Sequence, residues 1–197
     1  MDNLHLFELI NAAPNPELWQ LGLALALGEW LIYLLPLGIS LAWVKGDSLA
    51  RRELVEMLFA ALIALALAQS VVHGWPQSRP FVQHLGTQLL AHANDPGLPS
   101  HHAVVFWSLA CSALMTRRFA VWGFPLLAGG LAVGWSRVFL GVNFPYDVLA
   151  ALPLALIGAL CARMLRTATM SAVGRILDCY DRLIRAVRSK LSVVRKT

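Results

Sequence analysis

The chain has 197 residues, of which 58% are hydrophobic and 14% charged, and its mean hydropathy is +0.63. A chain this apolar cannot cover a compact surface with polar side chains, which excludes a soluble globular protein. The composition therefore predicts an integral membrane protein.

An apolar stretch of about 20 residues can cross the hydrocarbon layer of a membrane as a helix. Five stretches approach this length, at about 18–44, 53–72, 101–115, 119–135 and 147–165. The third is short, so we expect it to begin inside the loop that precedes it. The sequence thus predicts an all-α fold, a polytopic transmembrane helical bundle of about five spans.

The positions of lysine and arginine predict the orientation of these spans. With five spans, all but two of the 16 basic residues fall on one side of the membrane. Positive residues mark the cytoplasmic side of a membrane protein, so the segment 73–100 and the turn around Asn143 face outward. The two exceptions, Arg79 and Arg137, lie on this outer face and need another explanation.

The two ends of the chain differ in character. The first 17 residues contain no lysine or arginine and no long apolar run, so no cleavable signal is predicted. The stretch 4–10 is either an interfacial amphipathic turn or a frayed terminus. The region 1–166 is predicted to be the membrane-embedded domain. Residues 167–197 are predicted to form a basic amphipathic tail, which either lies on the anionic inner leaflet or packs on a second protomer.

Two loop segments on the outer face carry polar side chains suited to phosphate. Arg79 follows span two in a Pro-rich loop, and a guanidinium binds phosphate oxygens through two parallel hydrogen bonds. Ser100 follows Pro99 and is the expected N-cap of span three, where backbone amides and the helix dipole favour an anion. His102 lies in the first turn of that span. Taken singly, a solvated arginine and a neutral capping histidine are the alternatives.

The third segment closes span four and opens span five. Arg137 ends span four, Gly141 permits a turn, and Pro145 suits the first turn of span five. Asp147 lies four positions beyond Asn143, so an early helical turn brings their side chains together. Asparagine alone is typical of turns and caps, whereas a carboxylate that starts an apolar span needs a partner.

In this order and spacing the segments resemble the type 2 phosphatidic acid phosphatase superfamily, and more narrowly the short bacterial undecaprenyl-diphosphate phosphatases. The resemblance covers nearly the whole chain and rests on Arg79-Pro80-Phe81, Pro99-Ser100 with His102, and Ser136-Arg137 through Asp147. It implies a multi-pass protein of the bacterial inner membrane whose site faces the periplasm or cell exterior. It also implies a polyprenyl diphosphate substrate in the membrane, no nucleic-acid partner, and no metal or other cofactor. A homo-oligomer is left open.

The resemblance also implies roles for individual residues. Arg79, Arg137 and Ser100 match the residues that hold the phosphoryl group, and His102 matches the histidine that protonates the leaving group. His101 stands where the family has glycine or a small acidic residue, and we group it with the phosphate-binding residues. It points about 100° away from its neighbour on the helix, so it is not expected to replace a nucleophile.

Asn143 occupies the position of the family's nucleophilic histidine, which Asp147 would orient and which forms a phosphohistidine. An amide nitrogen has a delocalised lone pair and cannot attack phosphorus. The chain is therefore predicted to bind a lipid diphosphate and to turn it over poorly or not at all. The asparagine is an introduced substitution, a natural feature of a pseudoenzyme, or a sign that another group attacks. Every other catalytic position except the lysine, which is Val72 here, is intact, which favours the first explanation.

Two further residues are candidate accessory groups. Glu29 lies deep in span one, where an ionisable side chain is a functional hypothesis by default. It is expected to pair with a motif arginine or histidine, to line the route of the lipid head group, or to be a protonated carboxyl bonded to a neighbouring span. His73 lies beside Val72, where the family often has lysine, and would supply part of that charge when protonated.

Two alternative functions come from other classes. The outer-face histidines, His101 and His102 with His73 or His92, could bind a transition metal, although no tight spacing supports this. Alternatively, the chain is a polyprenyl-phosphate binding or transport protein that uses the same anion site without turnover. Another lipid phosphatase or phosphotransferase of the superfamily would share these motifs as well.

Overall fold

The computed structural model of the protein describes residues 2–194, with the side chains of 186–194 outside that description. The described residues form helices, turns and loops and contain no strand, which confirms the all-α class. The helices are α1 (Asn3–Ile10), α2 (Leu18–Leu25), α3 (Leu34–Lys45), α4 (Ser48–Gly74), α5 (His101–Leu114), α6 (Ala120–Phe139), α7 (Pro145–Leu149), α8 (Ala151–Met164) and α9 (Arg166–Val194). A π-helical turn, η1 (Ala26–Trp30), and a 3-10 turn, η2 (Leu31–Tyr33), join α2 to α3, and a second 3-10 turn, η3, covers Pro80–Gln83.

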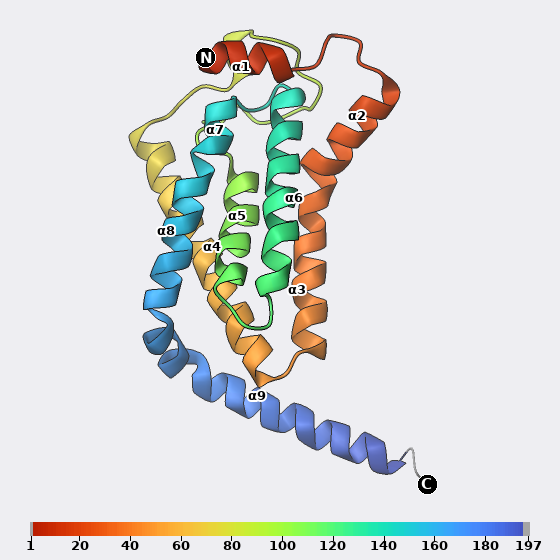
Figure 1. Ribbon diagram of the computed structural model, residues 1–197, viewed down its shortest axis with the longest axis vertical. Coiled ribbons are helices and arrows are strands. Elements are labelled where there is room, and N and C mark those ends of the chain that lie inside the picture. The colour runs from red at the N-terminus through yellow and green to blue at the C-terminus, as the bar shows by residue number, and fades with distance from the viewer. Residues whose placement is uncertain (1, 195–197) are drawn as a thin grey trace.

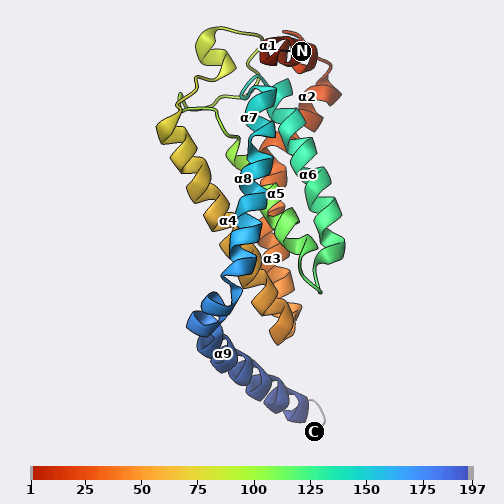
Figure 2. The ribbon, with the colours of Figure 1, turned by 60° about the vertical axis from the view of Figure 1, so that its left-hand side comes forward.

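Helix α5 forms the centre of the bundle and packs against α4, α6 and α8 (Figures 1 and 2). Small residues bring the surrounding helices close together. A Cβ atom on Gly158 of α8 would lie 2.7 Å from the carbonyl oxygen of Ala60 and 2.8 Å from Cβ of Ala64, both on α4. Helices in membranes associate through such close contacts because burial of apolar surface gives no drive in lipid.

Three stretches are long and apolar enough to cross a membrane, judged by length and composition: Leu18–Lys45, Ser48–Gly74 and Pro145–Met164. Helix α5 is apolar but has 14 residues, in line with the expectation that it begins inside a loop. Helix α6 has 20 residues, but its glycines, tryptophans and Arg137 lower its hydropathy. The count of five spans therefore stays a prediction.

Helix α1 lies across one end of the bundle (Figure 1). Phe7 is fully buried there, and its ring meets the ring of Phe144 edge-on at a centroid distance of 5.3 Å. Asn11 accepts a hydrogen bond from the backbone N–H of Thr87 at 2.7 Å and donates to the Phe139 carbonyl at 3.1 Å. The frayed terminus considered for residues 4–10 is therefore wrong, because this segment is a helix packed on the protein.

Helix α9 begins at the opposite end of the bundle and packs on α4 (Figure 2). Asp181 forms a buried ion pair with Arg51, and Asp178 pairs with Arg52 at 2.6 Å. Leu177 is buried on the same side of the helix. The tail is helical as predicted, but the first half of its apolar face packs on its own bundle, which neither sequence-based alternative included.

Gly141 makes the turn between α6 and α7. Its φ of +77° lies in the left-handed region, and a Cβ atom would stand 2.2 Å from the carbonyl oxygen of Thr87. Glycine alone adopts this conformation without steric cost. The turn predicted at this residue is confirmed, and it sets the path from Arg137 to α7.

We expect Gly141→Ala to destabilise the protein, because alanine would carry a left-handed backbone at a cost of about 1–2 kcal/mol before any clash. Thermal unfolding in detergent should show a Tm lower by roughly 2–8 °C. Gly38→Ala is the matched control, since a Cβ atom there meets nothing within 4 Å. Equal melting temperatures for the two variants would contradict this account of the turn.

Candidate functional site

The three polar segments meet at the end of the bundle that carries α1. Arg79 directly precedes η3, Ser100 precedes α5, and the stretch from Arg137 to Asp147 joins α6 to α7. We call Arg79, Ser100, His102, Arg137, Asn143 and Asp147 the arginine site. The structure thus brings together residues that lie up to 68 positions apart in the chain.

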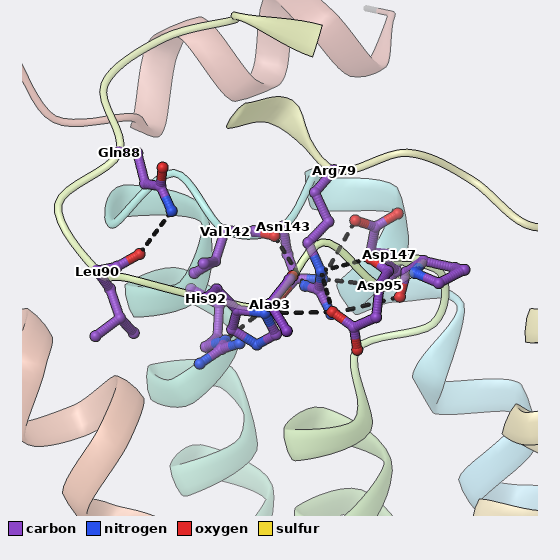
Figure 3. Close-up of polar contacts among 12 residues, drawn as sticks. Arg79, Gln88, Leu90, His92, Ala93, Asp95, Val142, Asn143 and Asp147 are labelled. Atoms are coloured by element: carbon purple, nitrogen blue, oxygen red, sulfur yellow. Dashed lines mark hydrogen bonds and ion pairs between the residues drawn. The ribbon is translucent and has the colours of Figure 1, made fainter. Parts of the chain in front are cut away.

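Arg79 is 4% exposed and is held by acceptors from two segments (Figure 3). Its Nε donates to the backbone carbonyl of Asp95 at 3.0 Å and to Oδ1 of the same residue at 3.1 Å. The terminal nitrogens donate to the carbonyls of Val142 at 3.0 Å and Pro96 at 3.4 Å. Arginine has more N–H donors than these contacts use, so Arg79 both ties the loop to the α6–α7 turn and keeps donors for a ligand.

Asp95 and His92 join the site without having been predicted as members of it. Burial raises the pKa of Asp95 and the Arg79 charge lowers it, and the net pKa lies below its ordinary value. His92 Nδ1 lies 3.3 Å from Asp95 Oδ1. Burial, together with the Arg79 and Arg137 charges, lowers the pKa of His92 below its ordinary value. A sequence signal existed for Asp95, because it is the one acidic residue between His73 and Ser100.

Asn143 is 1% exposed, and its amide is fully engaged (Figure 3). Its Nδ2 donates to the Gly97 carbonyl at 3.0 Å and to Asp147 Oδ2 at 3.3 Å. Its Oδ1 accepts from Arg137 Nε at 3.4 Å. The contact with Asp147 confirms the pairing expected from the four-residue spacing.

Asp147 and Ser100 each leave one buried atom without a hydrogen-bond partner among the described residues. Asp147 Oδ2 accepts from the backbone N–H of Phe144 at 2.8 Å, but Oδ1 has no donor. Ser100 occupies the predicted N-cap position of α5, yet its hydroxyl does not cap the helix and stays unbonded. An unsatisfied buried polar atom is costly, and of the two the Ser100 hydroxyl is a donor that is available to an oxygen of a ligand.

Arg137 and the two histidines complete the site. Arg137 is 4% exposed and, among the described residues, its guanidinium makes the single contact with Asn143. His102 is partly buried and lies within electrostatic range of Arg137 and Arg79. His101 lies within electrostatic range of Arg79 and Asp95. Neither ring is hydrogen-bonded to a residue in the described part of the chain.

The two accessory candidates have different outcomes. Glu29 lies in the π-helical turn η1, exposed, with no ion pair or hydrogen bond to a described residue, but within electrostatic range of Arg137. Neither the expected pairing of its carboxylate nor a bond to a neighbouring span is observed. Of the three expectations for Glu29, only a position along the route of the lipid head group stays a prediction. His73 is exposed, and its Nδ1 lies 2.7 Å from the carbonyl of Gln69 on its own helix, away from Arg79.

Residues 2–194 contain no group of three or more histidine, cysteine, aspartate or glutamate side chains placed to hold a metal ion. The outer-face histidines considered as a transition-metal site therefore do not form one in the described structure. His92, His101 and His102 lie within electrostatic range of Arg79, which fits a site for an anion better than a site for a cation.

Comparison with known proteins gives a family and a fold. Residues 53–171 match the PAP2 superfamily. The chain is 35% identical over 164 residues to the putative undecaprenyl-diphosphatase YbjG of Escherichia coli, covering 83% of this chain and 82% of that protein. It is 28% identical over 155 residues to the undecaprenyl-diphosphatase BcrC of Bacillus subtilis, covering 79% of each. The crystal structure of Aquifex aeolicus LpxE has the same fold, with a TM-score of 0.64 at 19% identity over 82% of this chain and 94% of that one.

We expect Gly97→Ala to disturb the site while leaving the fold intact. A Cβ atom there would lie 3.0 Å from Asp147 Oδ2 and 3.1 Å from Arg79 Cγ, so both side chains would have to move. Binding of inorganic diphosphate, measured by isothermal titration calorimetry, should weaken by about tenfold to a hundredfold. Gly74→Ala is the control, since nothing lies within 4 Å of its Cβ position. Unchanged binding by Gly97→Ala would show that the loop does not set the site.

Proposed function

The chain belongs to the PAP2 superfamily, and we propose that its arginine site binds undecaprenyl diphosphate. The form with histidine at position 143 would hydrolyse this lipid to undecaprenyl phosphate and phosphate. The observation that carries the proposal is that two buried arginines and Ser100, whose hydroxyl is unbonded, are all tied to the stretch 142–147: Arg79 bonds to the Val142 carbonyl, Arg137 to Asn143, and the Ser100 N–H to the Asp147 carbonyl. This arrangement suits a phosphoryl group, which accepts hydrogen bonds from all three. The names of the two bacterial relatives support the choice of lipid.

In the proposed reaction Arg79 and Arg137 hold the oxygens of the terminal phosphoryl group and stabilise the charge that builds there. The ring nitrogen of a histidine at position 143 forms a bond to phosphorus while the bond to the bridging oxygen breaks. His102 gives a proton to that departing oxygen, which stays with the lipid phosphate. Water then cleaves the phosphohistidine and releases inorganic phosphate.

Asparagine at position 143 stops this sequence at its first bond. Its Nδ2 is a hydrogen-bond donor to Gly97 and Asp147, and its lone pair is delocalised into the amide. The chain would therefore hold its substrate without turnover. Of the three explanations for the asparagine, the complete set of surrounding contacts supports a substitution in an otherwise working phosphatase over long-standing loss of function.

The proposal includes five membrane spans, with the arginine site at the outer face of a bacterial inner membrane. The distribution of basic residues supports this orientation, because among the lysines and arginines of residues 2–194 Arg79 and Arg137 alone lie at the site end, and both are part of the site. The polyprenyl tail would lie in the lipid, and the exposed Glu29 would flank the route of the diphosphate between bilayer and Arg137.

We expect Asn143→His to restore phosphate release from undecaprenyl diphosphate by on the order of a thousandfold or more, because it restores the nucleophile. Released phosphate is measured in detergent micelles, alongside phosphatidylglycerophosphate and diacylglycerol diphosphate to rank the substrates. Asn94→His, which adds the same side chain on the exposed loop, is the control and should stay inactive. If Asn143→His releases no phosphate from any of these lipids but still binds them, the binding or transport alternative replaces the enzyme.

Binding in the asparagine form should depend on Arg137. Truncation of a charged partner in a buried site costs about 2–5 kcal/mol, so Arg137→Ala should weaken binding of undecaprenyl diphosphate at least about thirtyfold. The measurement is equilibrium binding to purified protein in micelles. Arg175→Ala, an exposed arginine of α9, changes the net charge equally and should bind normally. Undiminished binding by Arg137→Ala would rule out the site assigned above.

A further inference from the structure

A cavity with arginines in its wall lies at the end of the bundle opposite the arginine site. At this end α4 begins, α5 and α8 end, and α9 begins (Figure 1). The volume of the cavity is about 250 Å³. The lining residues are Leu49, Glu53, Met115, Arg117, Arg163 and Arg166. Nothing in the proposed phosphatase reaction uses this cavity, which we call the basic cavity.

Two of its arginines share one carboxylate. Glu56 is 2% exposed, and its Oε1 lies 3.3 Å from Arg163 Nη1 while its Oε2 lies 3.2 Å from Arg166 Nε. A single carboxylate balances one of the two positive charges. Each guanidinium has further N–H donors that these contacts leave unused, and both side chains are partly exposed, Arg163 by 44% and Arg166 by 36%.

The third arginine has no carboxylate of its own. Both oxygens of the buried Glu53 accept backbone N–H bonds, from Arg117 at 3.0 Å and Arg118 at 2.9 Å. Glu53 therefore holds the α5–α6 loop in place and does not bond to a guanidinium. The side chain of Arg117 is exposed and makes no ion pair with a described residue. Three guanidiniums thus face two carboxylates, which leaves the basic cavity with an excess positive charge.

We propose that the basic cavity binds the phosphodiester head group of an anionic phospholipid such as phosphatidylglycerol. Arginines bind phosphate oxygens in pairs of parallel hydrogen bonds, and basic cavities between the ends of membrane helices suit anionic head groups. A lipid is favoured over free phosphate by the apolar surface beside the cavity. Leu160 and Met164 of α8 are 45% and 83% exposed next to Arg163, and they offer a surface for acyl chains.

The test uses native mass spectrometry of the detergent-solubilised protein, titrated with dioleoylphosphatidylglycerol and, separately, with dioleoylphosphatidylcholine. All proteins carry Arg137→Ala, which silences the arginine site, so the result does not depend on the proposed phosphatase function. Arg117→Gln should weaken binding of the first phosphatidylglycerol by about tenfold, and the double variant Arg117→Gln, Arg166→Gln by more. Phosphatidylcholine should bind weakly and show no such dependence.

Arg118→Gln is the control, because it removes the same charge from the adjacent position outside the cavity wall, where the side chain pairs with Asp47, and it should bind phosphatidylglycerol as the parent does. The Arg117 side chain is exposed and makes no hydrogen bond or ion pair with a described residue, so its single variant is expected to fold and keeps the test valid if the double variant does not. Equal losses in Arg117→Gln and Arg118→Gln, or equal affinity for the two lipids, would overturn the proposal. Inorganic phosphate that binds with the same dependence on Arg117 and displaces the lipid at millimolar concentration would assign the cavity to free phosphate instead.

Discussion

Asp147 is buried and connects two of the three segments of the arginine site, the α6–α7 turn and the start of α5. One of its oxygens accepts the N–H of Phe144 and the amide of Asn143, and its backbone carbonyl accepts the N–H of Ser100 at 2.9 Å. The residue is 1% exposed, and a buried charge is tolerated only with compensation of this kind. Asp147 therefore fixes position 143 relative to the start of α5, and the free Oδ1 shows that the protein supplies only part of that compensation.

The two buried arginines have different parts in the site, although the sequence presents them as equals. Arg79 uses most of its hydrogen-bond donors on other residues of the chain. These bonds hold the Asp95 loop against the turn at Val142. Arg137 makes one long contact with Asn143 and keeps its terminal nitrogens available. Two like charges in one buried site repel each other, and Asp95, half exposed, balances chiefly the first. A phosphate anion would balance the charge of Arg137. We therefore expect substrate binding to depend on Arg137 more than on Arg79.

The parts of the site that the sequence predicted correctly are those determined over a few residues. Pro145 begins α7, Gly141 makes the turn, and Asn143 meets Asp147, because turn chemistry and helical spacing determine each locally. The contact of Asp95 with Arg79 depends on the path of an irregular loop, which has no periodicity to read.

Contacts between residues far apart in the chain, and the choice among competing hydrogen-bond partners, also could not be predicted from the sequence. The ion pair between Arg51 and Asp181 joins residues 130 positions apart, so no local pattern encodes the docking of α9. Ser100 was expected to cap its helix with its hydroxyl, and it takes the cap position but leaves that hydroxyl free. A free hydroxyl at a helix start is the opposite of what local propensity favours, and such local conflicts gather at sites that bind ligands.

A histidine at position 143 would have one nitrogen bonded to the protein and one free to attack phosphorus, and asparagine can supply only the first. Its Nδ2 stands in the place of the proximal ring nitrogen and makes the bonds to Asp147 and Gly97 that orient the side chain. A histidine has a second nitrogen at the far edge of its ring, and that atom is the one able to attack phosphorus. Asparagine thus keeps the hydrogen bonds to Gly97 and Asp147, and we expect it to keep the folding and substrate binding that depend on them. In the proposed function the nitrogen that would face the phosphoryl group is missing, so we expect asparagine at position 143 to impair the chemical step and not the binding of the lipid.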